Sequence, residues 1–233
     1  MDNDLAQLEK KLSITFINKD LLLQAFIHRS YLNEHKDFRL DHNERLEFLG
    51  DACLELIVTE YLYSTYPNPE GELTNWRAAL VRGSMISKIA RDLGYEEYLM
   101  LSRGEAQAGG RARDLILANT FEAVLGALYL DQGYDVASDF ILVHLIKHLP
   151  EILDQNLHHD PKSRFQELVQ EKVGITPNYE LEKDEGPDHD KIFTMGVYIN
   201  EKKVTEGSGP SKQIAEQEAA RAAIDVWEEN MME

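Results

Sequence analysis

Apolar residues recur at three- and four-residue intervals through most of the first 150 positions. This spacing places apolar side chains on one face of an α-helix. The runs that show it are DLLLQAFIHRSYL, LEFLGDACLELIVTEYLYSTY, NWRAALVRGSMISKIARDLG, DLILANTFEAVLGALYLDQG and VASDFILVHLIKHLPEIL. Stops and turns are indicated by Pro67, Pro69, Gly94, Gly109, Gly110 and Gly133. The pattern predicts an all-α domain over residues 1–152.

The pattern changes after Pro150, where a short polar stretch predicts a linker over residues 153–160. A helical run from Lys162 to Val173 follows it. Three runs then alternate apolar and polar positions, as strands with one buried face do: NYELEKD, KIFTMGVYIN and KKVTEGS. The last helical run extends from Ser211 to about Trp227. We therefore predict a small α+β domain over residues 161–230, with the order α-β-β-β-α and a three-stranded antiparallel sheet.

The overall charge argues against a polyanionic partner. The 233 residues include 24 Lys and Arg against 42 Asp and Glu, a net charge of −18. From Pro161 onward there are 9 basic and 16 acidic residues, a net of −7, which leaves −11 for the first 160. Nucleic-acid binding depends on neutralising phosphates. Binding to RNA or DNA would therefore rest on a few well-placed cations and would be weak and sensitive to salt.

The cysteine content and the N-terminal sequence indicate a cytoplasmic protein. Cys53 is the one cysteine, so no disulfide can form within the chain, and its apolar surroundings predict a packed thiol. The N-terminal stretch MDNDLAQLEKKL has no apolar signal-peptide core. No apolar run approaches the roughly 20 residues of a membrane-spanning helix. We expect cytoplasmic residence and no membrane association.

Three carboxylates on one predicted helix are candidate metal ligands. Glu44, Glu47 and Asp51 lie at positions i, i+3 and i+7, within about 60° of arc on the helix surface. Their mutual repulsion is unfavourable unless a cation compensates, and oxygen ligands at this spacing suit Mg²⁺. The same helix is predicted to lie in the interior, flanked by the apolar residues Leu46, Phe48, Leu49, Cys53 and Leu56.

A second helix carries Asn119 and Glu122 one turn apart on a largely apolar surface. Individually, the acidic residues have simpler explanations. Glu44 could close a capping box with Asp41, and Glu47 could be a solvated helix charge. The three carboxylates beside a second polar pair favour a site, although spacing alone leaves both interpretations open.

Several blocks of the sequence resemble the ribonuclease III family. The segment HNERLEFLGD resembles the signature motif of that family, and AFIHRSYLNE, LVRGSMISKIARDLG and GEAQAGGRARDLILANTFEAVLGALYLD resemble the surrounding blocks in order and spacing. The second half is similar to a double-stranded RNA-binding domain at SRFQELVQE, EGPDHDKIFTMGVYIN and GSGPSKQIAEQEAARAAI. The resemblance covers nearly the whole chain.

The resemblance implies an endoribonuclease that processes double-stranded RNA, including ribosomal RNA, as a homodimer. It implies Mg²⁺, with Mn²⁺ as a substitute, and no small-molecule cofactor. Glu47, Asp51 and Glu122 match carboxylates of the family's metal site, and Glu44 is a supporting acidic residue of the signature. Glu70 matches a further acidic residue that lines the family's RNA-binding valley. The implied products carry 5′-phosphate and 3′-hydroxyl ends with short 3′ overhangs.

Asn119 departs from the family, which has an aspartate at this position among its catalytic, metal-binding residues. An amide keeps one oxygen that can coordinate a metal, but it removes a negative charge, so Mg²⁺ should bind less well. We therefore expect impaired cleavage with RNA binding retained. The alternative is a double-stranded RNA-binding or assembly protein that does not cleave.

The resemblance also identifies residues for contact with duplex RNA, whose minor groove and phosphates are accessible to proteins. Gln166 and Gln170 would face one minor groove, and His189 would reach the next. Ser211 and Lys212 stand at a helix start, where backbone N–H groups favour phosphate. Arg111 and Arg113 have two open interpretations, phosphate contact or surface pairing with Asp114.

Overall fold

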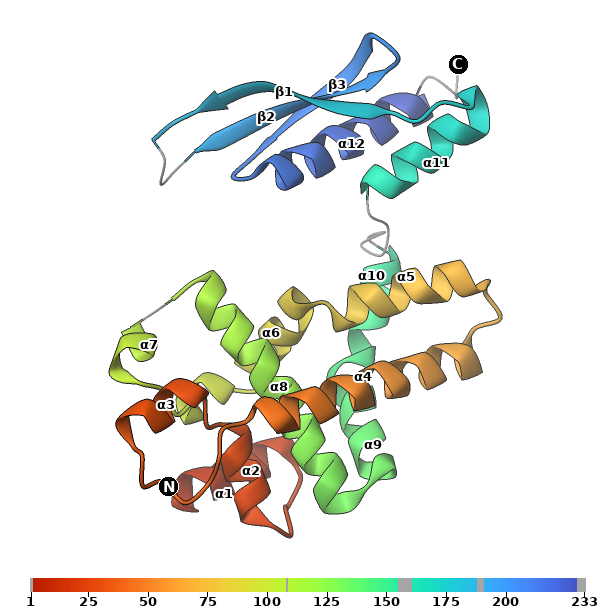
Figure 1. Cartoon of the computed structure of the whole chain (residues 1–233). Coiled ribbons are helices and arrows are strands. Elements are labelled where there is room, and N and C mark those ends of the chain that lie inside the picture. Colours follow the sequence, from red (N-terminus) through yellow and green to blue (C-terminus); the bar gives the residue numbers. More distant parts are fainter. Residues whose placement is uncertain (1, 108, 155–160, 188–190, 230–233) are drawn as a thin grey trace. The chain divides into compact units, whose positions relative to one another are not determined.

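The computed structural model describes residues 2–107, 109–154, 161–187 and 191–229 (Figure 1). The chain forms two compact units, residues 1–158 and residues 159–233. The first is helical and the second combines two helices with a sheet, which confirms the predicted fold class.

The first unit is built around two long helices that cross, α4 and α8 (Figure 1). Each is 22 residues long, so each extends about 33 Å. The shorter helices surround this pair, and a single apolar core joins them. The elements are α1 (Asp2–Leu12), α2 (Lys19–Ala25), α3 (Arg29–Glu34), α4 (Glu44–Thr65), α5 (Glu70–Val81), α6 (Gly83–Asp92), η1 (Tyr95–Tyr98), α7 (Arg103–Gln107), α8 (Arg111–Gln132), α9 (Tyr134–His144), η2 (Ile146–His148) and α10 (Leu149–Asp154).

Two runs with continuous helical periodicity are interrupted. The first divides into α5 and α6 at Arg82, whose ψ of 142° is extended rather than helical. The second divides into α9, η2 and α10 before Pro150. A proline ring clashes with the carbonyl four residues earlier, so it is tolerated only in the first turn of a helix, and Pro150 occupies the first turn of α10. Periodicity alone could not show these breaks.

One face of α4 contradicts the prediction of an interior helix. Leu46 and Cys53 are buried, but Phe48 is 80% exposed and Leu56 is 58% exposed. Apolar spacing identifies a helix and its apolar positions, but it does not show whether those positions face the chain's own core or its surface.

The second unit has the predicted order of elements: α11 (Pro161–Val173), β1 (Asn178–Glu185), β2 (Ile192–Ile199), β3 (Lys202–Gly209) and α12 (Lys212–Glu229). The strands form an antiparallel sheet in the order β1-β2-β3. Both helices pack on one face of the sheet, around Phe165, Val169 and Val197. A β-carbon on Gly207 would lie 2.1 Å from the backbone nitrogen of Ala219, so this glycine allows β3 and α12 to approach closely.

Among the helices of the described segments, none is both long enough and apolar enough to span a lipid bilayer.

Candidate metal centre and nucleic-acid interface

Two glycines bring the candidate metal residues together where α4 crosses α8. A β-carbon on Gly50 would lie 1.7 Å from the backbone oxygen of Glu122, and one on Gly126 would lie 2.2 Å from the backbone oxygen of Leu46. Neither position can hold a larger residue without moving a helix. The backbones therefore touch, which places the polar face of α4 beside that of α8. Apolar spacing alone did not indicate a role for these glycines, although each lowers helix propensity by about 1 kcal/mol relative to alanine, a cost that signals a packing role.

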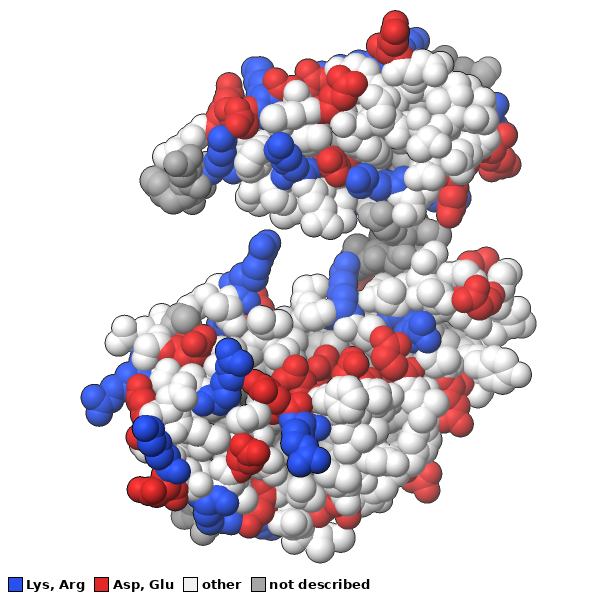
Figure 2. All heavy atoms as spheres, in the orientation of Figure 1, with Lys and Arg blue, Asp and Glu red and all other residues white. Residues whose placement is uncertain are grey.

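Four of the predicted site residues meet at this crossing. Glu47 and Asp51 come from α4, while Asn119 and Glu122 come from α8. Asp51 is exposed and the other three are half-buried. Figure 2 shows acidic side chains gathered over this region, with basic side chains at its margins. The sequence-based grouping of two helix faces therefore corresponds to one surface.

Asn119 is directly linked to Glu47. Its side-chain amide donates a hydrogen bond to the Glu47 carboxylate. Burial raises the pKa of Glu47, and repulsion from Glu44 and Asp51 raises it further, whereas the bond from Asn119 lowers it. The amide therefore partly replaces, by hydrogen bonding, the stabilisation that a cation would give to Glu47.

Glu122 has the most perturbed carboxylate of the centre. Burial raises its pKa to about 7, with further contributions from the negative charges of Asp51 and Glu47. No basic side chain is among the groups that shift this pKa. The protein alone leaves this carboxylate uncompensated, which is the electrostatic condition that a divalent cation would relieve.

The donor set is chemically suited to a hard cation such as Mg²⁺, because every side chain offers oxygen. The residues are nevertheless not drawn together around one point. Among the described residues, no three His, Cys, Asp or Glu side chains form a group that could hold a metal ion. Like charges separate when no cation lies between them, and one Glu47 oxygen accepts from Asn119. The set still fits Mg²⁺ in the chemistry of its donors.

Asn43 fixes the start of α4. No pattern in the sequence predicted this role. Asn43 is 4% exposed, and its Nδ2 donates to the backbone oxygen of Ala25 at 3.0 Å. Its backbone oxygen accepts from the Glu47 N–H at 2.9 Å. Asp41 does not form the capping box considered for Glu44, because it accepts from the neighbouring His42 N–H instead. Asn43 therefore anchors the turn that presents Glu47.

Glu44 lies beside the centre rather than within it. It is exposed, and its carboxylate lies 3.6 Å from the Arg29 guanidinium. Its charge contributes to the raised pKa of Glu47, so it acts on the centre through space.

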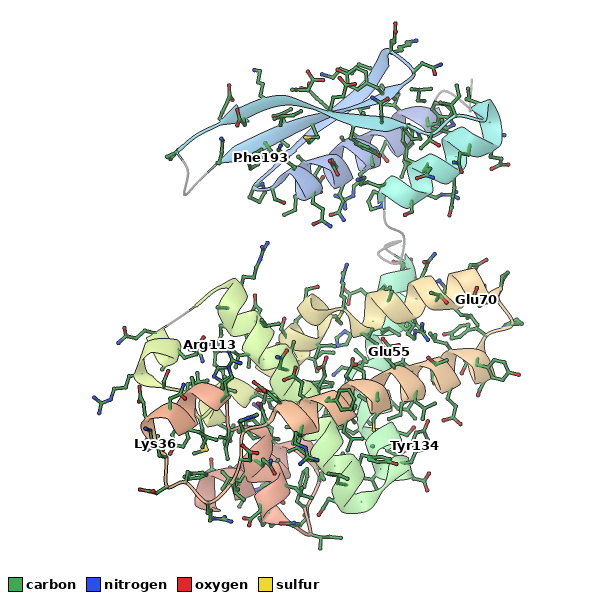
Figure 3. The ribbon with its side chains drawn as sticks, viewed as in Figure 1. Lys36, Glu55, Glu70, Arg113, Tyr134 and Phe193 are labelled. Atoms are coloured by element: carbon green, nitrogen blue, oxygen red, sulfur yellow. The ribbon has the colours of Figure 1, made fainter. Side chains whose placement is uncertain are left out.

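Glu70 is not brought to this centre within one chain. It begins α5, beyond the opposite end of α4, and its carboxylate accepts from the Thr74 hydroxyl at 3.0 Å (Figure 3). Asp51 precedes the last residue of α4 by 14 positions, or about 21 Å of helix. Between them, Glu55 pairs with Arg77 of α5 at 3.0 Å.

Cys53 is packed in the core, and His28 contacts the start of a helix. Cys53 is 7% exposed, and burial raises its pKa, which disfavours the reactive thiolate. The predicted packed thiol is confirmed. The His28 ring lies 2.8 Å from the Ser30 hydroxyl at the start of α3.

Two of the residues predicted to contact RNA lie on α11. Gln166 and Gln170 are both exposed on α11, beside the buried stripe of Phe165 and Val169. Gln170 donates to the Thr176 hydroxyl at 3.2 Å. His189 lies outside the described residues.

The start of α12 combines a cap with an exposed cation. The Ser211 hydroxyl accepts from the Ile214 N–H at 3.3 Å, which satisfies one free donor of the first turn. Lys212 is exposed beside it. Ser211 therefore caps α12. A contact with RNA would have to use the same hydroxyl.

Arg113 is used within the chain and also lies 3.8 Å from the Glu96 carboxylate, while a phosphate contact stays a prediction. Its side chain is 11% exposed and donates to the backbone oxygens of Glu105 and Ala106. Asp114 pairs with Arg91 at 2.8 Å rather than with Arg113. Figure 3 shows Arg113 directed toward the segment around α7. Arg111, in contrast, is exposed.

Comparison with known protein families gives two matches. Residues 18–149 match the family model described as ribonuclease-III-like, and residues 161–226 match the double-stranded RNA binding motif. The two matches coincide with the helical unit and the sheet-containing unit.

Curated and solved relatives agree with these matches. The chain is 46% identical over 228 residues to Ribonuclease 3 of Enterococcus faecalis, covering 96% of this chain and 98% of that protein. It is 49% identical over 222 residues to Ribonuclease 3 of Natranaerobius thermophilus, covering 95% of each. The solved nuclease domain of ribonuclease III from Campylobacter jejuni is 37% identical with a TM-score of 0.56, covering 62% of this chain and 95% of that one. The chain belongs to the ribonuclease III family, with a helical nuclease domain and a double-stranded RNA-binding domain.

Proposed function

We propose that this protein cleaves double-stranded RNA by Mg²⁺-dependent hydrolysis of phosphodiester bonds, with lower activity than a four-carboxylate centre would have. The observation that carries the proposal is the crossing at Gly50 and Gly126, which groups Glu47, Asp51 and Glu122 with Asn119. Family membership and the attached RNA-binding domain support the substrate class.

The chain's own residues would have distinct roles in this reaction. Glu47, Asp51, Glu122 and the Asn119 side-chain oxygen would hold the ion. When bound, Mg²⁺ supplies water activation and charge neutralisation at the phosphate. Glu122 must first release its proton to solvent, because its pKa of about 7 leaves much of it protonated at neutral pH. The exposed Asp51 faces the side from which RNA can approach.

Asn119 is the residue that we hold responsible for reduced activity. It contributes no negative charge, and its amide hydrogen must leave the Glu47 carboxylate before that oxygen can face a cation. Both effects would weaken metal binding, and neither would change the RNA-binding domain. Duplex binding should therefore survive where cleavage is slow.

We further propose that the protein works as a homodimer. The exposed face of α4 carries Phe48, Leu56 and Tyr63, and exposed apolar surface of this kind marks protein interfaces. Beside it is a groove of about 430 Å³ between α4 and α5, lined by residues that include Tyr63, Leu73 and Arg77. The nuclease domain of ribonuclease III from Campylobacter jejuni is described with a region involved in dimer formation. Two centres acting on opposite strands would produce the short 3′ overhangs.

Incubation of the full chain with a long, end-labelled RNA duplex tests this function. We expect cleavage in Mg²⁺ or Mn²⁺, none in EDTA, and 5′-phosphate ends on the products. Glu122→Gln should abolish cleavage without loss of duplex binding. Glu97→Gln, which removes the same charge from an exposed position on η1, is the matched control and should cleave normally. Cleavage that persists in EDTA would contradict the proposal.

The second candidate is a duplex-RNA-binding or assembly protein that does not cleave. It is favoured by Asn119, which supplies no negative charge and donates a hydrogen bond to Glu47. A mobility shift of the duplex without any cutting, even at high Mn²⁺, would support this candidate and exclude the nuclease.

A further inference from the structure

Most basic side chains of the second unit are already paired with carboxylates. Of the 9 basic residues from Pro161 onward, six form ion pairs within the unit: Lys162, Arg164, Lys183, Lys191, Lys203 and Arg221. No ion pair within the described segments involves Lys172, Lys202 or Lys212. Phosphate must therefore compete with the protein's own acids for many of the cations.

One of these pairs lies on the face of the sheet where α12 begins. Asp184, Phe193 and Gly209 are direct partners across the three strands, so their side-chain positions share one face. A β-carbon on Gly209 would lie 2.6 Å from the Ile214 side chain, so this face is the one that α12 covers. Figure 3 shows Phe193 at the end of the sheet near the start of α12.

Asp184 interacts with two lysines at this end of the domain. Its Oδ2 lies 2.7 Å from Lys191 Nζ, which also lies 5.7 Å from the centre of the Phe193 ring. The hydrogen bond from Lys191 lowers the pKa of Asp184, and the positive charge of Lys212 adds to this shift. Both partners remain accessible, with 33% of the Lys191 side chain and 46% of the Asp184 side chain exposed. An incoming phosphate can therefore reach the same cations.

We propose that Asp184 competes internally with RNA phosphate for Lys191 and Lys212, and so limits the affinity of this domain for duplex RNA. This inference rests on the proposed double-stranded RNA binding. A carboxylate that pairs with Lys191 prevents that lysine from neutralising a phosphate and lowers the positive potential at Lys212. In a domain with a net charge of −7, few cations of the described segments lie outside ion pairs, so the loss of one phosphate contact matters.

The competition predicts a gain of function. Replacing Asp184 with asparagine keeps the size of the side chain and removes its charge, which releases Lys191. Each phosphate neutralised in a duplex steepens the dependence of log K on log salt by roughly 0.7–0.9. We expect Asp184→Asn to steepen this slope by about one unit and to tighten binding by about three- to tenfold at moderate salt.

The experiment measures binding of the full chain, in EDTA, to an RNA duplex longer than the ~16 base pairs that such a domain spans. Affinity is determined at several salt concentrations for the wild type, Asp184→Asn, Lys191→Ala and the double variant. Lys191→Ala alone should have little effect, because Asp184 already occupies Lys191. In the Asp184→Asn background, the same change should cancel the gain.

Glu182→Gln is the matched control, because it removes the same charge from the same strand. Glu182 pairs with Lys203 at 3.0 Å, but it lies over Gly196 on the open face of the sheet. It should not increase the salt slope. An equal gain for Glu182→Gln would show a general effect of net charge and would overturn the role of Asp184.

Lys212→Ala separates this inference from the proposed function. If Lys212→Ala weakens binding while Asp184→Asn leaves affinity and slope unchanged, the domain binds RNA and the internal competition is wrong. If the wild type fails to bind the duplex even at low salt, RNA binding and the competition are both wrong. Circular dichroism and thermal unfolding of each variant confirm that any lost affinity is not lost folding.

Discussion

Asn119 changes the acidic centre in two ways at the scale of the single residue. It removes a negative charge and supplies a hydrogen-bond donor to Glu47. From the sequence, the lost charge could be inferred from the resemblance to the ribonuclease III family. The donated hydrogen bond could not, because it depends on the approach of α4 and α8. We therefore expect the amide to stabilise the metal-free centre and to weaken metal binding there.

Glu122 should make the metal-free protein less stable as the pH rises. Its pKa is about 7 in the folded state and ordinarily 4.5, so between these pH values the folded protein holds a proton that the unfolded chain has lost. Stability therefore falls with rising pH through this window. Thermal unfolding in EDTA should show the loss, and Glu122→Gln should remove it.

The control for this pH dependence is Glu70→Gln, which removes a charge from the start of α5. It should retain the wild-type slope of melting temperature against pH. A Glu122→Gln variant that also retains the wild-type slope would show that Glu122 is not the group responsible. Mg²⁺ should stabilise the wild type more above about pH 7 than below it, since the ion displaces this proton.

At the scale of the elements, the close crossing of α4 and α8 is the feature on which the centre depends. Gly50→Ala should lower the free energy of unfolding by about 1–3 kcal/mol or more. The added methyl group overlaps the Glu122 backbone and forces the helices apart. Urea unfolding measures this change. Mg²⁺ binding by calorimetry should weaken as well, because Glu122 moves away from Glu47.

Gly71→Ala is the matched control in α5, where a β-carbon would meet nothing within 4 Å. It should be neutral or stabilise the protein by up to about 1 kcal/mol, as alanine favours helix over glycine. Equal stability changes for the two substitutions would contradict the packing role of Gly50.

The sequence predicted the elements better than their environment. Local periodicity indicates where helices and strands form, and both the helical character of the first unit and the α-β-β-β-α order of the second are confirmed. The exposure of Phe48 and the burial of Arg113 depend on contacts between distant segments, which periodicity does not contain. The four residues at the crossing could be proposed from helix spacing and resemblance, but the glycines and Asn43 that position them emerged only from the fold.

At the scale of the whole molecule, the exposed apolar face of α4 should hold two chains together. Phe48→Glu places a charge on this face and should convert the dimer into a monomer, which sedimentation velocity detects. Ile17→Glu is the control, because Ile17 is 81% exposed and does not belong to α4. A wild type that sediments as a monomer, or a Phe48→Glu variant that remains dimeric, would contradict the proposed interface.

The net charge of −18 should make duplex binding strongly dependent on salt, because only local cations attract the RNA. We expect binding of duplex RNA and binding of metal to be separable, because we assign the RNA contacts named above to the second unit and the metal ligands to the first. Cleavage measured at saturating protein should then report mainly on the acidic centre.

The most direct test compares cleavage of a long RNA duplex by the wild type and by Asn119→Asp during a Mg²⁺ titration. Mutating a residue that only supports a metal ligand typically changes metal affinity or activity by about 10–100-fold, so restoring the charge of a direct ligand should raise the rate at low Mg²⁺ by at least about tenfold. The account predicts this increase, with duplex binding in EDTA unchanged. Equal cleavage rates at every Mg²⁺ concentration would show that the amide does not limit the reaction.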